Sequence, residues 1–227
     1  MYRIRLLDSK LIGTVKWVPF VIDLFALLIC EIIFPANKDA WLALELLFPC
    51  STVWWGIFYM GEVWQKSPVT ELLYAWNHKF QKVVTVKYAI FSLSFSFLHV
   101  ILAAVVCIPV DPECANVFLV LLFLECLAFS GLGYLLSAGI CDAGWAIILI
   151  MCIIVCDYGT QGKLFRKLHF SLYWYDELTF ALVGTRLIAA ACVMILSFWA
   201  GYLVMRRTKG RGVQLFSTWG IIKRKTD

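Results

Sequence analysis

Five charged side chains stand inside long apolar stretches of the sequence, where charge is costly. They are Asp23, Glu31, Glu45, Glu125 and Arg186. A charged group in the middle of a lipid bilayer costs several kcal/mol unless it is paired or hydrated. We therefore expect these side chains to face the interior of a helix bundle, a cavity or the membrane interfaces. They either line the path of a transported solute or, through an ion pair of Glu125 with Arg186, fix how the helices pack.

The sequence gives little support for a catalytic site or a metal-binding site. The three histidines, His78, His99 and His169, are expected at the inner face, the middle and the outer face of a membrane, so they cannot converge on one site with a cysteine. We expect His99 to be a hydrogen-bonded packing residue rather than a proton relay. The sequence contains no His-Glu-x-x-His, no Cys-x-x-Cys and no Gly-x-x-x-x-Gly-Lys-Ser/Thr loop, so it predicts neither a metal ion nor nucleotide hydrolysis in this chain.

The composition indicates which elements position these residues. Of 227 residues, 62% are hydrophobic and 15% are charged, and the mean hydropathy is +0.84. A soluble domain is about half apolar and about a quarter charged. Six apolar runs approach the ~20 residues that a bilayer-spanning helix needs, at about 17–35, 41–63, 86–109, 114–140, 144–156 and 179–205. We predict a single all-α membrane domain over 1–227 with six transmembrane helices.

Basic residues are unevenly divided between the two sides that six crossings define. Fifteen of the 20 Lys and Arg residues precede the first span, flank the loop between the second and third, or follow the last, and only four lie on the other side. Cytoplasmic loops carry such an excess, so both termini are predicted to be cytoplasmic. The net charge of +5 then favours contact with anionic lipid rather than with nucleic acid.

The loop between the second and third spans has the pattern of a short amphipathic helix. Ser67 followed by Pro68 is typical of an N-cap with proline at the first helical position, and Glu71 falls in the first turn, where the helix dipole favours an anion. Apolar side chains then recur at helical spacing, among them Leu72, Leu73 and Trp76. This helix either anchors the loop at the membrane surface or docks into an apolar groove of a partner.

The order of these elements resembles the membrane subunit of a type-2 ATP-binding-cassette exporter, the permease class that includes O-antigen and G-subfamily transporters. In that family the coupling helix between the second and third spans is preceded by a Glu and a stretch such as Gly-Thr-x-Glu-x-Leu-Leu. Glu62 and Thr70-Glu71-Leu72-Leu73 match this pattern, whereas the usual Arg and Gly are absent. The stretch from Gly131 to Ser137 is similar to the family's small-residue pattern, which close helix packing also explains.

The resemblance implies a type V exporter fold and a permease without a cofactor of its own. A separate cytosolic ATP-binding-cassette ATPase would bind ATP and Mg and would sit on the coupling helix, formed by Ser67, Pro68, Thr70, Glu71, Leu72, Leu73 and Trp76, with Glu62 on its approach. A second permease subunit, identical or different, would complete the transporter. Residues 163–175 would form re-entrant outer helices, or else an aromatic belt at the membrane interface.

The implied function is export of an amphipathic solute, such as a peptide, a lipid-like molecule or an antibiotic, across the plasma (cytoplasmic) membrane of a bacterium. The chain would be a multi-pass transport subunit and not an enzyme. Two alternatives stay open. One is an integral membrane enzyme, a peptidase or acyltransferase, and the other is an accessory membrane subunit without transport activity.

Overall fold

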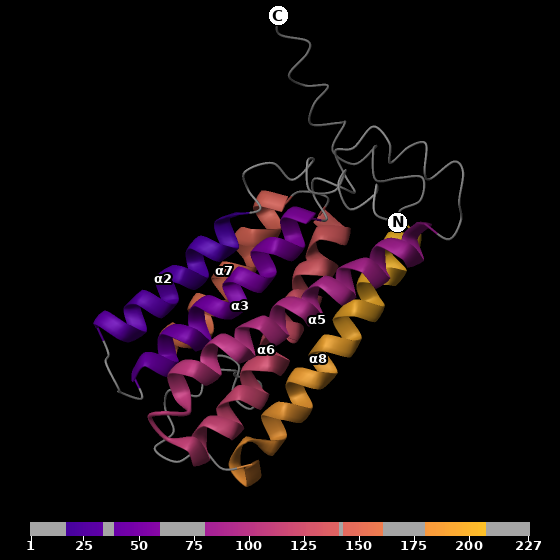
Figure 1. The fold of residues 1–227 in the computed structure, drawn as a ribbon. Coiled ribbons are helices and arrows are strands. Elements are labelled where there is room, and N and C mark those ends of the chain that lie inside the picture. The colour runs from indigo at the N-terminus through magenta and orange to yellow at the C-terminus, as the bar shows by residue number, and fades with distance from the viewer. Residues whose placement is uncertain (1–16, 34–38, 60–79, 141–142, 161–179, 208–227) are drawn as a thin grey trace, which may run out of the picture.

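The computed structural model describes residues 17–33, 39–59, 80–140, 143–160 and 180–207 (Figure 1). All regular structure in these ranges is helical, in six elements. These are α2 (Val18–Ile32), α3 (Asp39–Tyr59), α5 (Phe80–Cys107), α6 (Pro112–Ile140), α7 (Ala143–Gly159) and α8 (Phe180–Arg207). The predicted coupling helix with Glu62, the predicted outer helices and both termini lie outside the described residues.

Four helices contain stretches that are long and apolar enough to cross a membrane. They are Ala40–Phe58, Val84–Cys107, Pro112–Ile140 and Val183–Arg206. The expected all-helical membrane architecture is therefore confirmed at this level. The apolar part of α7 is shorter, at Gly144–Asp157, and α2 has 15 residues.

Helix α5 begins before the apolar run that predicted it. It starts at Phe80, whereas the hydropathy pattern places the third span from residue 86. The first turns of α5 carry Lys82 and Lys87, which lower the hydropathy of this stretch without interrupting the helix. A run of apolar residues therefore indicates only the part of a helix that suits the hydrocarbon core, and the helix itself can be longer.

Contacts between α2, α3 and α5 show that successive helices run in opposite directions. The Ser51 hydroxyl donates to the carbonyl of Pro19, and the Cys30 thiol donates to the carbonyl of Ala40. The start of α2 thus meets the later part of α3, and the end of α2 meets its start. Helix α5 reverses again, since His99 lies against Thr52 and Tyr88 lies against Gly56. The end of α3 and the start of α5 therefore share one end of the bundle.

Helix α6 is the central element and contacts α3, α5, α7 and α8 (Figure 1). In its apolar stretch 61% of the residues are buried, against 17% in that of α8. Small residues allow this close packing. A Cβ atom at Gly131 would lie 3.2 Å from the carbonyl oxygen of Met194 in α8, and one at Gly133 would lie 3.3 Å from Ile57 in α3. The small residues at 131 and 133 thus serve helix packing.

Candidate functional site

Glu31 is exposed near the end of α2, whereas the other four charged residues expected inside spans are buried within the bundle. Their exposed fractions are 4% for Asp23, 4% for Glu45, 1% for Glu125 and 5% for Arg186. The structure divides them into two groups. Asp23 joins a hydrogen-bonded network with a histidine, whereas the other three gather in a second region together with Asp157.

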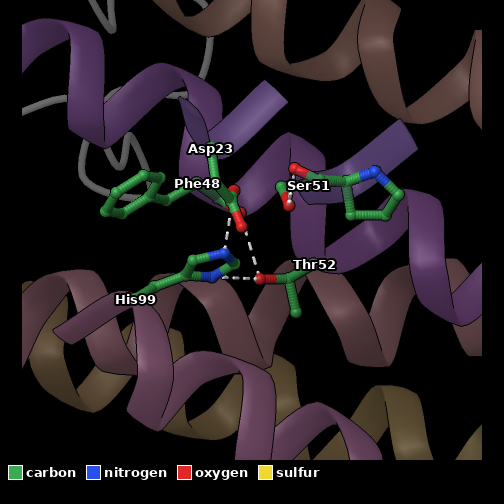
Figure 2. A network of polar contacts seen from close by, with 6 residues as sticks. Asp23, Phe48, Ser51, Thr52 and His99 are labelled. Carbon is green, nitrogen blue, oxygen red and sulfur yellow. Dashed lines mark hydrogen bonds and ion pairs between the residues drawn. The ribbon is translucent and has the colours of Figure 1, made fainter. Parts of the chain in front are cut away.

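The first group, which we call the histidine network, consists of Asp23, Thr52 and His99. Figure 2 shows the His99 ring between the other two side chains, which come from α2 and α3. Nε2 of His99 lies 3.0 Å from Oδ1 of Asp23, and Nδ1 lies 2.9 Å from Oγ1 of Thr52. Both ring nitrogens therefore have a polar partner, although His99 itself is fully buried.

Aromatic packing fixes the plane of the His99 ring. The Phe48 ring stacks on it with centroids 4.6 Å apart and an angle of 19° between the planes. Phe95 approaches from α5 itself at 6.1 Å. The second carboxylate oxygen of Asp23, Oδ2, is buried and has no hydrogen-bond partner among the described residues. The site thus holds an ion-pair geometry with one polar atom left unsatisfied.

His99 is the last member of a polar stripe along the buried face of α5. The earlier members recur at helical spacing and are Thr85, Tyr88, Ser92 and Ser96. Tyr88, Ser92 and Ser96 are at most 4% exposed. Large apolar side chains cover the opposite face, including Ile90, Phe97, Ile101 and Val105. This helix is therefore polar toward the bundle and apolar toward its surroundings, which is the arrangement that suits lipid.

The hydroxyl groups of Thr85, Tyr88 and Ser92 are bonded to α6, whereas that of Ser96 is buried without a hydrogen-bond partner among the described residues. Ser92 and Ser130 share a hydrogen bond of 2.5 Å between their hydroxyls, and the Tyr88 hydroxyl donates to the carbonyl of Ser130 at 2.8 Å. Nearer the start of α5, the hydroxyls of Thr85 and Tyr134 lie 2.6 Å apart. Polar contacts thus extend from the first turns of α5 toward the histidine network.

A small cavity lies between this stripe and the histidine network. Its volume is about 10 Å³, which is roughly the room that one water molecule needs. Its lining residues are Thr52, Trp55, Gly56, Tyr88, Phe91, Ser92 and Phe95. Thr52 belongs to the network and Ser92 to the stripe, so the cavity joins the two.

The second group, which we call the charged cluster, consists of Glu45, Glu125, Asp157 and Arg186 on α3, α6, α7 and α8. Glu125 interacts electrostatically with the other three. Its Oε1 atom is buried without a hydrogen-bond partner within the described ranges. Arg186 is the seventh residue of α8, so it lies closer to the start of its helix than to the middle that the sequence suggested.

The charged cluster is not arranged as a metal site. Among the described residues, no group of three or more His, Cys, Asp or Glu side chains could hold a metal ion. In α3, Pro49 lacks the N–H that would bond to the carbonyl of Glu45. In the interior, Glu125 thus interacts with two other acids and with one guanidinium.

The histidine network has the order of groups found in hydroxyl nucleophiles, but it lacks room for a substrate. A hydroxyl next to an imidazole that contacts a carboxylate is the arrangement that activates such nucleophiles. Thr52 is only 2% exposed, and the cavity beside it, about 10 Å³, is far smaller than the ~300 Å³ or more of ordinary ligand pockets. The geometry suits proton transfer and not acyl transfer.

Sequence reasoning missed Asp157 and the polar stripe. Asp157 lies just beyond the fifth apolar run, which ends at 156, whereas the structure buries it inside α7. The stripe had a visible signal, since residues 85, 88, 92, 96 and 99 recur at intervals of three and four. The candidate residues inside the spans were chosen from the sequence by their formal charge, so residues with hydroxyl groups were not included.

The remaining predicted residues, Glu62 and the coupling-helix set at 67–76, lie outside the described residues, so their positions stay predictions. Comparison of the chain with protein-family models, with curated proteins and with solved structures gives no match.

Proposed function

We propose that this chain is the membrane-embedded permease subunit of an ATP-driven exporter. It is not itself an enzyme, since ATP and Mg are bound by a separate cytosolic ATPase of the ATP-binding-cassette type. A second permease subunit, identical or different, completes the path for an amphipathic solute. The chain resides in the plasma membrane, and its N- and C-termini are cytoplasmic.

The observation that carries this proposal is the relation of α3 to α5. The two helices are antiparallel and meet through Thr52 and His99, so residues 60–79 connect them at one end of the bundle. That connection contains the predicted coupling-helix pattern around Glu71 and Trp76. An amphipathic helix at a helix-bundle end is placed to receive force from a soluble partner and pass it to two spans at once.

The buried ionisable groups of the bundle are a second argument for transport. Such groups inside membrane helices are costly and often mark substrate, ion or proton pathways. Among the described residues, five such side chains are buried besides His99, namely Asp23, Glu45, Glu125, Asp157 and Arg186. They come from five of the six described helices, so relative movement of the helices changes their surroundings.

The proposal is tested by removing the predicted anchor of the coupling helix. Trp76→Ala should reduce co-purification of the ATPase from membranes at least about tenfold, because central aromatic side chains carry ~2 kcal/mol or more of an interface. Asn77→Ala is the matched control, since Asn77 lies on the polar side of the same predicted helix. Full recovery of the ATPase with Trp76→Ala would remove the coupling assignment.

A further inference from the structure

We propose that Asp23, Thr52 and His99 form a proton-binding site inside the membrane, loaded through the small cavity beside Thr52. The proposal concerns groups of this chain alone and does not depend on an ATPase partner. It goes beyond export, because the charge inside the helix bundle would then change when a proton binds.

The Thr52 hydroxyl has one hydrogen and more than one neighbour that can accept it, and it also interacts with the Cys126 thiol. Its Oγ1 lies 3.0 Å from the carbonyl oxygen of Phe48 and 2.9 Å from Nδ1 of His99. When the hydroxyl donates to Phe48, Oγ1 accepts an N–H from Nδ1. The second N–H of the ring, at Nε2, then donates to the Asp23 carboxylate, so His99 is an imidazolium paired with an anion.

Rotation of the same hydroxyl gives a second bonded state. The Thr52 hydroxyl then donates to Nδ1, and the neutral His99 ring keeps only its Nε2 hydrogen, which stays on Asp23. The carbonyl oxygen of Phe48 loses this hydrogen bond but keeps another, because in an α-helix it also accepts from the backbone N–H four residues later. Both ring nitrogens of His99 thus stay hydrogen-bonded in two states that differ by one proton on Nδ1.

The cavity lies beside the Thr52 hydroxyl. Thr52, Tyr88 and Ser92 are among its lining residues, and it has about the room of one water molecule, although most of its surface is apolar. In the proposed transfer, a proton from a water molecule in this cavity binds Oγ1 of Thr52 while the hydroxyl hydrogen passes to Nδ1, so the threonine ends with one hydrogen, as before. The water recovers its proton through Ser92, whose hydroxyl is hydrogen-bonded to Ser130 and through Ser130 to Tyr88.

The stripe of polar residues on α5 covers only part of the membrane. Thr85 and His99 are 14 residues apart, or about 21 Å along the helix at ~1.5 Å per residue, against a hydrocarbon core of ~30 Å. Beyond His99, the buried face of α5 continues with Ala103 and Cys107, both fully buried, and neither offers a hydroxyl. On α5 the stripe therefore ends at the histidine network.

The titratable groups around His99 come from three helices. Asp23 comes from α2. Cys126 of α6 lies near Asp23, and Cys50 of α3 and Glu125 of α6 lie near Cys126. Buried thiols behave as small apolar groups, so the charges that stabilise an imidazolium here are Asp23 in direct contact and Glu125 at longer range.

Solid-state NMR of the full-length protein in lipid vesicles, with ¹⁵N-labelled histidine, tests the site. Signals of His99 are assigned by their loss in His99→Gln or, should that variant misfold, by their survival when His78→Gln and His169→Gln are combined. As the pH is lowered stepwise, Nδ1 should gain a hydrogen while Nε2 keeps its own. An unchanged ring, or a hydrogen gained at Nε2, would overturn the proposal.

The route is tested by the rate of proton exchange at His99 after a pH jump, followed by infrared spectroscopy. Thr52→Val should slow exchange by about tenfold or more, because it removes the relaying group, whereas Thr52→Ser should keep the wild-type rate. If Thr52→Val fails to fold, Ser92→Ala is compared with Ser94→Ala, a serine on the exposed face of α5. Equal rates within either pair would overturn the cavity route.

Discussion

The histidine network and the charged cluster are both buried among the same helices, yet they are built differently. In the histidine network one acid faces one base, and both ring nitrogens of His99 have a partner within 3.0 Å. In the charged cluster, Glu125 interacts with two other acids and with Arg186, and it keeps a buried oxygen without a hydrogen-bond partner among the described residues. Cys126, next to Glu125 in α6, is in electrostatic contact with Asp23, so the two regions are close neighbours.

The difference shows two ways of keeping ionisable groups in an apolar interior. The histidine network can change its charge and stay bonded, because the Thr52 hydroxyl can turn. The charged cluster relies instead on the guanidinium of Arg186. We infer that the histidine network responds to protons, whereas the charged cluster holds α3, α6, α7 and α8 in register.

The largest effect should follow from removing the only base of the charged cluster. Arg186→Ala is expected to lower the free energy of unfolding by about 3–5 kcal/mol, because it leaves buried acids without a compensating charge. Arg206→Ala, near the exposed end of α8, should change it by only about 0.5 kcal/mol. Denaturation in mild detergent, followed by circular dichroism, measures both. Similar losses in the two variants would contradict a structural role for the cluster.

An intermediate effect is expected where α3 and α5 approach each other beside the cavity. A Cβ atom at Gly56 would collide with the hydroxyl and ring of Tyr88, which is buried and cannot move freely. Gly56→Ala should therefore cost about 1–3 kcal/mol and displace Tyr88 from Ser130. Gly139→Ala is the control, since nothing lies within 4 Å of its added Cβ atom. If both variants are equally stable in the same denaturation assay, α3 and α5 do not pack as closely at Gly56 as the structure shows.

The smallest effect should come from the start of the polar stripe. Tyr134→Phe removes the hydroxyl that lies 2.6 Å from Thr85 and should cost about 0.5–1.5 kcal/mol. Tyr202→Phe, at a half-buried position of α8, should cost less. A larger loss with Tyr202→Phe in thermal unfolding would show that the stripe adds little to stability.

The helices of this fold were predictable, but the contacts between them were only partly so. Apolar runs locate spanning helices because lipid demands an apolar surface of a certain length. The contact of Asp23 with His99 joins residues 76 positions apart, and no local pattern indicates which helices will be neighbours. Glu125 and Arg186 could be grouped because each is the only charged residue near the middle of its apolar run.

Other features of the candidate site needed the structure. Asp157 follows an apolar run and resembles an interfacial residue until α7 is seen to continue to Gly159. The serines on α5 face opposite sides, since Ser92 and Ser96 are buried and Ser94 is exposed. Alternating serines in a sequence do not by themselves indicate which side of a helix faces the bundle.

The most direct test of the proposed function is the side of the membrane on which residues 60–79 lie. A protease cleavage site inserted between Lys66 and Ser67 can be probed in sealed vesicles of both orientations. A coupling segment that binds a cytosolic ATPase should be cut in inside-out vesicles and protected in right-side-out ones. Cleavage in right-side-out vesicles would place the segment outside the cell and contradict the proposal.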